Sequence, residues 1–326
     1  MTLQEKEFIT TWNDRFSQDV QIQVFLTKDK RSEELRQFCR DLSRFAPKIT
    51  VLEKKDTDIQ TPFIQVGQRI FYHALPLGKE LEPFLEAICL SDQKNVSFDK
   101  SIYDQVNSIK ISASLKLYVA EQCPFCPKMV RDLLPLTVIN EFISLRIIDG
   151  TFFPEPAETD GIRSVPTLLL GESFRWSGLT PIQEIIEILA NQDSSRIGAS
   201  SIENMLQEGN AAHIGQMMLD AQKIFPAFLD VLVHEKWPLR LGAMVAMEEI
   251  IEHDIQLAAQ VIEPLWERFH DIDDQAKGDV LYIFGECGDD KILAALESVL
   301  TGPYNSEIKE AAKEAITSIQ QRMGNK

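Results

Sequence analysis

The amino-acid sequence predicts an α/β protein in which one strand–helix unit occurs twice and is followed by a region of helices alone. Residues 1–190 alternate between β-branched segments with a two-residue period and segments with helical spacing. A proline and a glycine recur at one constant separation, as duplicated units require. Because only helical patterns remain further on, we expect three domains, at 1–91, 92–191 and 192–326.

The first unit is predicted to have the order β-α-β and then β-β-α. Its opening segment, VQIQVFL, alternates apolar and polar residues, which is typical of a strand. The next segment repeats apolar residues, Leu35, Phe38 and Leu42 among them, at helical spacing. The expected strands are Val20–Leu26, Ile49–Leu52, Phe63–Val66 and Arg69–Tyr72, and the expected helices are Ser32–Phe45 and Leu77–Cys89.

The second unit keeps this order and much of the spacing. Val24 corresponds to Leu117 at an offset of 93 residues, and Pro62 corresponds to Pro166 at an offset of 104. The additional residues fall in 150–163, which we expect to be a loop. The expected strands are Leu115–Val119, Ile143–Ile148 and Thr167–Leu170, and the expected helices are Cys126–Leu136 and Thr180–Ala190, with a linker and a first helix within 91–110.

The composition changes after the second unit. A linker at 191–201 precedes a continuous run of helical patterns. Leu229, Leu265 and Leu296 correspond to one another at separations of 36 and 31 residues. This spacing resembles two to three HEAT-type repeats, whose stacked helices form binding surfaces, so we expect the region to bind a protein partner. The expected helices are 225–233, 239–251, 257–269, 275–287, 292–300 and 307–322.

The charge and the distribution of apolar residues exclude several classes of partner. A formal net charge of −17 would repel nucleic acid and anionic lipid. Solubility is the main explanation of this acidity, and selection of a basic partner is a lesser one. The sequence shows no apolar segment of about 20 residues and no basic segment followed by an apolar run, so we expect neither a membrane span nor a secretory signal. The expected location is the cytoplasm.

The five cysteines include one close pair, Cys123 and Cys126, in the segment QCPFCP between a predicted strand and a predicted helix. A helix N-terminus stabilises negative charge, so the pKa of the Cys123 thiol should be lowered and its thiolate should be the nucleophile. Two intervening residues leave Cys126 close enough to resolve a mixed disulfide. The other three, Cys39, Cys89 and Cys287, are expected to be small buried apolar side chains.

A C-x-x-C pair has two other common uses. A zinc site would need two further Cys or His ligands, and the five histidines are isolated in the sequence, so we expect no metal and no other cofactor. A purely structural disulfide is disfavoured in a reducing compartment. The first unit lacks the pair, because the repeat register places Lys30 at the position of Cys123 and Glu33 at that of Cys126. We expect that unit to be redox-inert.

Four segments carry a resemblance to a known family: CPFC, IIDGTFF (Ile147–Phe153), GIRSVPT and ALPLGKE (Ala74–Glu80). Through them, the chain from about residue 15 to 190 resembles the tandem thioredoxin-like module of the alkyl hydroperoxide reductase flavoprotein subunit. It is also similar to the glutaredoxin-like protein disulfide oxidoreductases. The resemblance implies two tandem thioredoxin-like domains, each a central sheet flanked by helices, in front of the HEAT-like helices.

The same resemblance assigns the substrate side of the site. In thioredoxin-like folds a proline opposite the dithiol follows a cis peptide bond, and Val165-Pro166 in GIRSVPT matches it. Such a bond leaves the Val165 backbone available to an extended substrate segment, whereas the simpler alternative is a proline that begins a strand. Pro124, which stiffens the turn between the cysteines, and Phe125 are expected to contact substrate as well.

One residue of the first unit is assigned a role by resemblance. Thioredoxins carry a buried aspartate six residues before the first cysteine, and that position here is Leu117. The resemblance implies that a carboxylate of the first unit replaces it, and Glu80 in PLGKE matches. Our hypothesis is that Glu80 assists Cys126 across the interface between the two units. The alternative is a surface glutamate at the start of a helix.

The sequence supports a protein disulfide oxidoreductase that reduces a protein client, with a peroxiredoxin-like partner as one candidate. No G-x-G-x-x-G segment is present, so we expect no flavin domain and an upstream dithiol or flavoprotein reductase as electron donor. An alternative is a redox adaptor or sensor in which the helical repeats are the main functional part. In a third interpretation the repeats are only a stabilising cap or a dimer interface.

Overall fold

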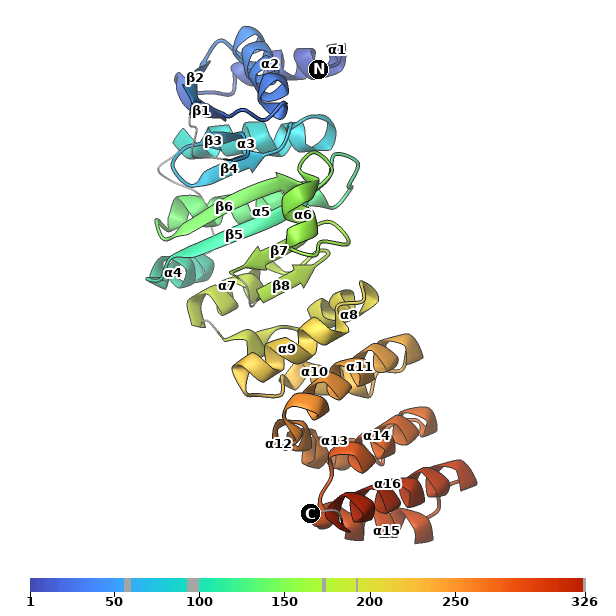
Figure 1. Ribbon diagram of the computed structural model, residues 1–326. Helices are drawn as coiled ribbons and strands as arrows, with labels where there is room; N and C mark the ends of the chain where they lie inside the picture. Colours follow the sequence, from blue (N-terminus) through green and yellow to red (C-terminus); the bar gives the residue numbers. More distant parts are fainter. Residues whose placement is uncertain (56–59, 93–99, 172–173, 192, 325–326) are drawn as a thin grey trace. The chain divides into compact units, whose positions relative to one another are not determined.

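The computed structural model describes residues 1–55, 60–92, 100–171, 174–191 and 193–324 (Figure 1). The chain divides into two compact units, 1–192 and 193–326. The first contains every strand of the described residues, and the second, here called the helical unit, contains helices alone.

The first copy of the repeat covers residues 1–92. Its opening strand buries alternate residues, as the period of VQIQVFL predicts. The structure adds a helix at Leu3–Asn13 that the sequence analysis did not predict, begun by a reciprocal capping box between Thr2 and Glu5. The elements are α1 Leu3–Asn13, β1 Val20–Leu26, α2 Arg31–Phe45, β2 Ile49–Lys55, β3 Phe63–Val66, β4 Ile70–His73, the 3-10 turn η1 Gly78–Glu80, and α3 Leu81–Asp92.

The second copy covers residues 100–191. The predicted loop at 150–163 is wrong in part, because it contains a short helix that Pro154 begins with a pre-set backbone angle. Ala157 of this helix packs with Phe153 into a buried apolar cluster. The elements are α4 Lys100–Ser108, β5 Ala113–Val119, α5 Cys126–Ile139, β6 Ile143–Asp149, α6 Pro154–Thr159, β7 Thr167–Leu170, β8 Phe174–Ser177 and α7 Ile182–Asn191.

The two copies share one eight-stranded sheet in the order β2-β1-β3-β4-β6-β5-β7-β8 (Figure 1). They join where β4 and β6 run parallel, with Ile70 opposite Leu145 and Tyr72 opposite Ile147. Helix α3 of the first copy packs against α5 of the second. Because backbone hydrogen bonds and helix packing both cross the junction, each copy is held in a fixed position relative to the other.

The helical unit consists of helix pairs. Within residues 193–324 the pairs are α8 with α9, α10 with α11, α12 and α13 with α14, and α15 with α16, one more than the largest predicted number. The second helices α9, α11, α14 and α16 contact one another in that order and form one layer. The helices are α8 Ala199–Gln207, α9 Ala211–Ala221, α10 Pro226–Leu232, α11 Trp237–His253, α12 Ile255–Ala258, α13 Ile262–Arg268, α14 Asp274–Cys287, α15 Leu293–Thr301 and α16 Ser306–Gly324.

The all-helical character of this unit is confirmed, with two differences from the prediction. Helices α8 and α9 were not predicted, and the predicted helix 257–269 is divided by a 3-10 turn, Ala259–Val261. Pro264 is consistent with the division, because a proline lacks an amide hydrogen and is favoured in the first turn of a helix, where it stands in α13. The assignment to the HEAT class stays a prediction. In the described part of the chain, no helix is long and apolar enough to cross a membrane.

Candidate active site

The two cysteines of the C-x-x-C segment form a disulfide between the end of β5 and the start of α5. Their Cα atoms lie 5.6 Å apart, and Cys126 is the first residue of the helix. The Cys123 amide donates a hydrogen bond to the Ala120 carbonyl at 3.0 Å, which fixes the turn after the strand. Leu117, beneath this turn in β5, is fully buried. The strand and the helix therefore hold both sulfurs in place.

The start of α5 stabilises negative charge on the first sulfur. The Cys126 amide donates to Cys123 Sγ at 3.1 Å. This amide belongs to the first turn of the helix, where donors have no partner within the helix and the dipole favours an anion. When the disulfide is reduced, the same donor stabilises a Cys123 thiolate.

Accessibility distinguishes the two sulfurs. Cys123 is 7% exposed, whereas Cys126 is 0% exposed. Phe125, between them, is 55% exposed and Pro124 is also exposed. Pro124, Phe125 and Cys123 are thus reached from solvent before Cys126. The roles of nucleophile and resolving thiol stay a prediction.

The predicted substrate segment lies beside the disulfide. Val165-Pro166 is a cis peptide bond, and the Val165 carbonyl oxygen lies 3.6 Å from Cys123 Sγ. Pro166 is buried at the start of β7, whereas Val165 is partly exposed and packs with Phe152 against the apolar cluster of the second copy. The structure therefore brings Val165 and Pro166 together with Cys123, as expected.

Glu80 is buried, so the alternative of a surface glutamate is wrong. It is 4% exposed, and neither carboxylate oxygen has a hydrogen-bond partner among the described residues. The turn η1 that carries it packs against α5, and the neighbouring Lys79 ammonium donates to the Gln122 carbonyl at 3.4 Å. Glu80 thus lies on the segment of the first copy that contacts the loop and helix carrying the dithiol.

The protonation of Glu80 is set by its surroundings. Burial penalises the charged carboxylate, and the pKa of Glu80 is raised to about 7. The positive charge of Arg131 lowers this pKa, whereas the negative charge of Asp149 raises it. Arg131, on α5, also donates to Glu82 at 2.8 Å and to Glu86 at 2.6 Å on α3. The sequence analysis missed Arg131 and Asp149, because their link to Glu80 crosses between copies and leaves no periodic signal.

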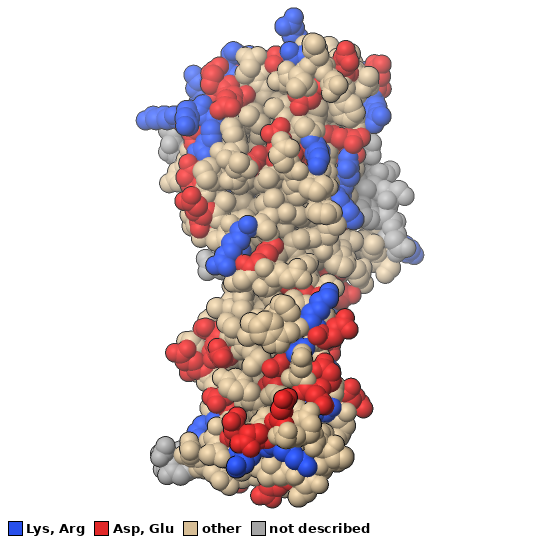
Figure 2. Space-filling model, turned by 90° about the vertical axis from the view of Figure 1, so that its right-hand side faces the viewer, with Lys and Arg blue, Asp and Glu red and all other residues tan. Residues whose placement is uncertain are grey.

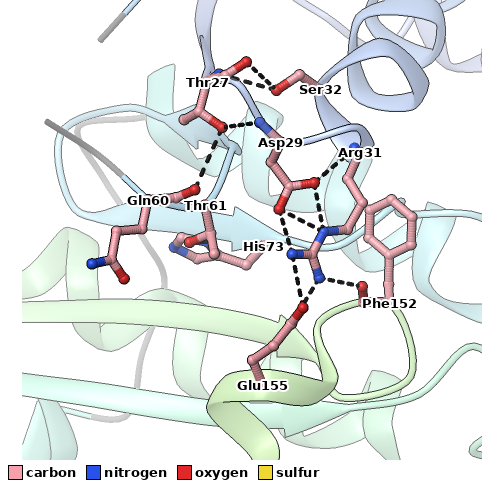
Figure 3. Close-up of polar contacts among 9 residues, drawn as sticks. All are labelled: Thr27, Asp29, Arg31, Ser32, Gln60, Thr61, His73, Phe152 and Glu155. Atoms are coloured by element: carbon pink, nitrogen blue, oxygen red, sulfur yellow. Dashed lines mark hydrogen bonds and ion pairs between the residues drawn. The ribbon is translucent and has the colours of Figure 1, made fainter. Parts of the chain in front are cut away.

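The corresponding region of the first copy holds an ion-pair cluster instead of a dithiol (Figure 3). The Arg31 amide, first in α2, donates to Asp29 Oδ1 at 2.8 Å, as the Cys126 amide does to Cys123 Sγ. By this hydrogen bond Asp29 and Arg31 take the places of Cys123 and Cys126, and the predicted correspondence with Lys30 and Glu33 is wrong. The cause is the different length of the loop between strand and helix, which spans residues 27–30 in the first copy and residues 120–125 in the second.

The remaining cysteines are separate from this site. Cys39 and Cys287 are buried, as predicted, and burial raises the pKa of each thiol to about 12. Cys89 is only half-buried, which departs from the expectation. Because a thiol with a raised pKa forms little thiolate near neutral pH, Cys39 and Cys287 are poor nucleophiles.

Fold and site together define a class: the described residues up to 191 have the fold of a tandem thioredoxin-like module, and its second copy carries a C-x-x-C disulfide. No protein-family model matches the chain. An NADH dehydrogenase of Ferdinandcohnia aciditolerans is 30% identical over 179 residues, 53% of this chain and 34% of that protein. An alkyl hydroperoxide reductase subunit of Staphylococcus aureus is 29% identical over 192 residues, 57% and 36% of the two chains. The chain thus spans about a third of the length of these relatives.

Two solved structures share the fold. The NTD_N/C domain of alkylhydroperoxide reductase AhpF from Enterococcus faecalis has a TM-score of 0.52 at 22% identity, covering 58% of this chain and all of that one. A protein disulfide oxidoreductase from Aeropyrum pernix has a TM-score of 0.52 at 16% identity, covering 59% and 93%. The covered shares fit the thioredoxin-like module and not the helical unit. The predicted fold of the module is confirmed.

Proposed function

We propose that this protein is a thiol–disulfide oxidoreductase that reduces disulfides of a protein client. The observation that carries the proposal is the arrangement of Cys123, which retains slight exposure to solvent, on an amide of α5, with Cys126 fully buried behind it. An accessible nucleophile with a protected resolving thiol is what two-step disulfide exchange requires. The similarity to the alkyl hydroperoxide reductase of Staphylococcus aureus supports a redox role for the module.

The reaction balances in two exchanges. The Cys123 thiolate attacks one sulfur of the client disulfide, a mixed disulfide forms, and the other client sulfur leaves and takes a proton. The Cys126 thiol then loses its proton and attacks Cys123 Sγ, which releases the second client sulfur. Two electrons pass to the client, and the protein ends as the Cys123–Cys126 disulfide.

Glu80 is proposed to accept the proton of Cys126 in the second exchange. A buried thiol needs a nearby base, and position 117, where thioredoxins carry an aspartate, is an apolar leucine. A carboxylate with a pKa of about 7 takes up and releases a proton near neutral pH. The burial of Glu80 and the contact of η1 with α5 support this role.

The substrate side is proposed to consist of Pro124, Phe125, Val165 and Pro166. Phe125 offers an exposed aromatic ring beside the nucleophile, and an extended client segment can pair with the backbone of Val165. Such a site recognises backbone and apolar surface more than a particular side chain. We therefore expect a protein client and not a small disulfide.

The electron donor and the client follow from the relatives only by analogy. We propose an upstream dithiol or flavoprotein reductase as donor and a peroxiredoxin-like protein as one candidate client. The direction is taken as reductive, because the cytoplasm that the sequence predicts keeps thiols reduced. The helical unit is proposed to dock the client.

Reduction of insulin disulfides tests the reaction, with dithiothreitol as donor and Cys123→Ser as the comparison. The expected result is turnover by the native chain and none by the variant. Turnover that persists in Cys123→Ser would contradict the assignment of the nucleophile. An inactive native chain would exclude a general disulfide reductase and favour the redox adaptor.

A further inference from the structure

The acidic residues of the chain are concentrated in the helical unit. Residues 193–326 contain 23 Asp and Glu against 11 Lys and Arg, a net charge of −12, whereas residues 1–192 contain 27 against 22, a net charge of −5. Asp and Glu predominate over the helical unit on the face that Figure 2 shows. If the negative charge served solubility alone, it would be spread over the chain in proportion to length. The helical unit is the shorter part and yet carries the larger net negative charge. Its charge therefore calls for a local explanation.

An apolar stripe lies exposed on α11. Trp237 is 53% exposed, Leu241 42% and Val245 43%. They follow one another at four-residue spacing and so form one line on the helix, which Glu248 continues. The opposite side of α11 is buried against its neighbours. About three turns of α11 thus present an exposed apolar line that ends in a carboxylate.

The stripe leads into a groove between α14 and α16. The Tyr282 hydroxyl of α14 lies 3.5 Å from Glu248 Oε1, which connects the two surfaces. The groove has a volume of about 560 Å³, and Gly278 leaves its floor open. At Gly285 the helices approach so closely that an added Cβ would lie 3.0 Å from Ala315 Cα. Small residues therefore shape a groove deep enough for side chains of another molecule.

Carboxylates line this groove. Glu286, Glu310 and Glu314 lie along it, and its one lysine, Lys313, is paired with Glu310 at 3.8 Å. Burial, and then the charges of Glu286 and Glu248, raise the pKa of Tyr282, which places both carboxylates close to its ring. No group of three or more Asp, Glu, His or Cys in the described part of the chain is arranged to hold a metal ion. The carboxylates are therefore available to a cationic partner.

We infer that the stripe Trp237–Leu241–Val245 and the α14–α16 groove form one docking surface for a basic, partly apolar segment of a protein client. Lysine or arginine side chains would meet the carboxylates of the groove, and apolar side chains would cover the stripe. A second copy of this chain is a poor occupant, because two strongly acidic units would repel each other. Nucleic acid and anionic lipid are excluded by the same charge. The inference rests on the proposed function and deepens it by naming the chemistry of the client.

Binding of a labelled peptide to the full chain tests the surface without any redox step. The probe is a fluorescein-labelled peptide of about 15 residues, long enough to extend about 50 Å, with Lys and Leu separated by Ser. The matched probe carries Glu in place of Lys. Fluorescence anisotropy is expected to show binding of the basic peptide only, with weakening when salt rises from about 20 mM to about 300 mM.

Charge-reversal pairs locate the site. Glu286→Lys with Glu314→Lys should weaken binding at least about tenfold, while Glu263→Lys with Glu297→Lys, on α13 and α15 of the other layer, should change it about twofold at most. Both pairs change the net charge equally. Equal losses in the two would overturn the inference, since net charge alone would then explain binding.

The apolar stripe is tested by Leu241→Ser, an exposed change that spares the core. We expect an affinity loss of about tenfold for the basic peptide. Cys123→Ser should bind as the native chain does, so a failure of docking and a failure of the proposed chemistry are distinguishable. Absence of peptide binding to the native chain at low salt would overturn the inference. So would a dimer in sedimentation that Leu241→Ser dissociates, because the occupant would then be a second copy.

Discussion

At the start of α2 a carboxylate accepts the first amide of the helix, and at the start of α5 a cysteine sulfur accepts it. The two copies thus use the same donor, at a helix end that favours negative charge. In the first copy the anion is Asp29, and the Arg31 hydrogen bond holds the pKa of its carboxyl below the usual value. In the second copy the charge on Cys123 appears only when the disulfide is reduced. The acceptor of the first copy therefore belongs to an ion pair, whereas that of the second copy belongs to a disulfide.

The ion-pair cluster of the first copy also supports the second copy. Arg31 donates to the Phe152 carbonyl at 2.9 Å and to Glu155 at 2.9 Å (Figure 3). Its guanidinium also lies 4.3 Å from the centre of the Phe153 ring. Phe152 and Phe153 pack with Val165, beside Cys123. The copy without a dithiol therefore contributes a fixed scaffold, and through Glu80 it contributes a buried carboxylate.

The largest expected effect is that of Cys126→Ser, which removes the thiol needed for the second exchange of the proposed reaction. Insulin turnover should fall at least about hundredfold, because the mixed disulfide on Cys123 cannot be resolved. Non-reducing electrophoresis should show the trapped protein–client adduct. Cys89→Ala, at a half-buried thiol outside the site, is the matched control and should keep its turnover. Full turnover in Cys126→Ser would show that the client or donor resolves the adduct.

Glu80→Gln tests the contribution of the first copy to catalysis. A base must be ionised, so native turnover should rise with pH through about 7, and the variant should lose about hundredfold at pH 8 together with this rise. Glu141→Gln, at an exposed glutamate in the turn after α5, is the control. An unchanged rate and pH profile in Glu80→Gln would remove Glu80 from the mechanism.

Glu80→Gln should also change stability in a pH-dependent way. A carboxyl whose pKa is about 7 in the folded chain and 4.5 otherwise binds more protons when folded, so native stability falls as pH rises from about 4.5 to 7. The variant does not have this penalty, and at pH 8 it should be more stable by up to about 3 kcal/mol. Urea unfolding at pH 5 and pH 8 measures the difference, which should fall below about 1 kcal/mol at the lower pH.

Arg131→Met tests whether the pKa of Glu80 sets the pH dependence of turnover, because Arg131 lowers that pKa. Without its positive charge, the rise of turnover with pH should move upward by about one unit at most. Arg131→Lys keeps the charge and should keep the native profile, which separates electrostatics from lost packing against α3. A profile that does not move in Arg131→Met would indicate that Glu80 does not set the pH dependence.

Arg31→Met should have the smallest effect on turnover and a clear effect on stability. It leaves the carboxylate of Asp29, 14% exposed, without its partner, which should cost about 2 kcal/mol in the free energy of unfolding. Turnover should stay within about twofold, because Arg31 touches neither sulfur. Arg40→Met, at an exposed ion pair, should be nearly neutral in urea unfolding. A larger loss of turnover would give the first copy a direct part in positioning Val165.

The sequence alone determined the elements whose signals are local. The alternation of VQIQVFL predicts β1 residue for residue, because every second side chain must be buried. The Cys123–Cys126 pair and the proline after Val165 were identified because disulfide exchange in this fold depends on these residue types at this spacing. Helix α6 was not predicted, because a helical period becomes visible only over several turns and α6 has too few of them.

Only the tertiary structure decided the contacts between the two copies. Pairing of β4 with β6 brings Arg31 to Phe152 and Glu155, and the packing of η1 on α5 buries Glu80 and gives its carboxyl a pKa of about 7. Burial and charge depend on what surrounds a side chain, and no periodicity along the chain records neighbours that are more than a hundred residues away. The sequence therefore predicted the nucleophile, whereas the fold revealed the surroundings of its proposed base.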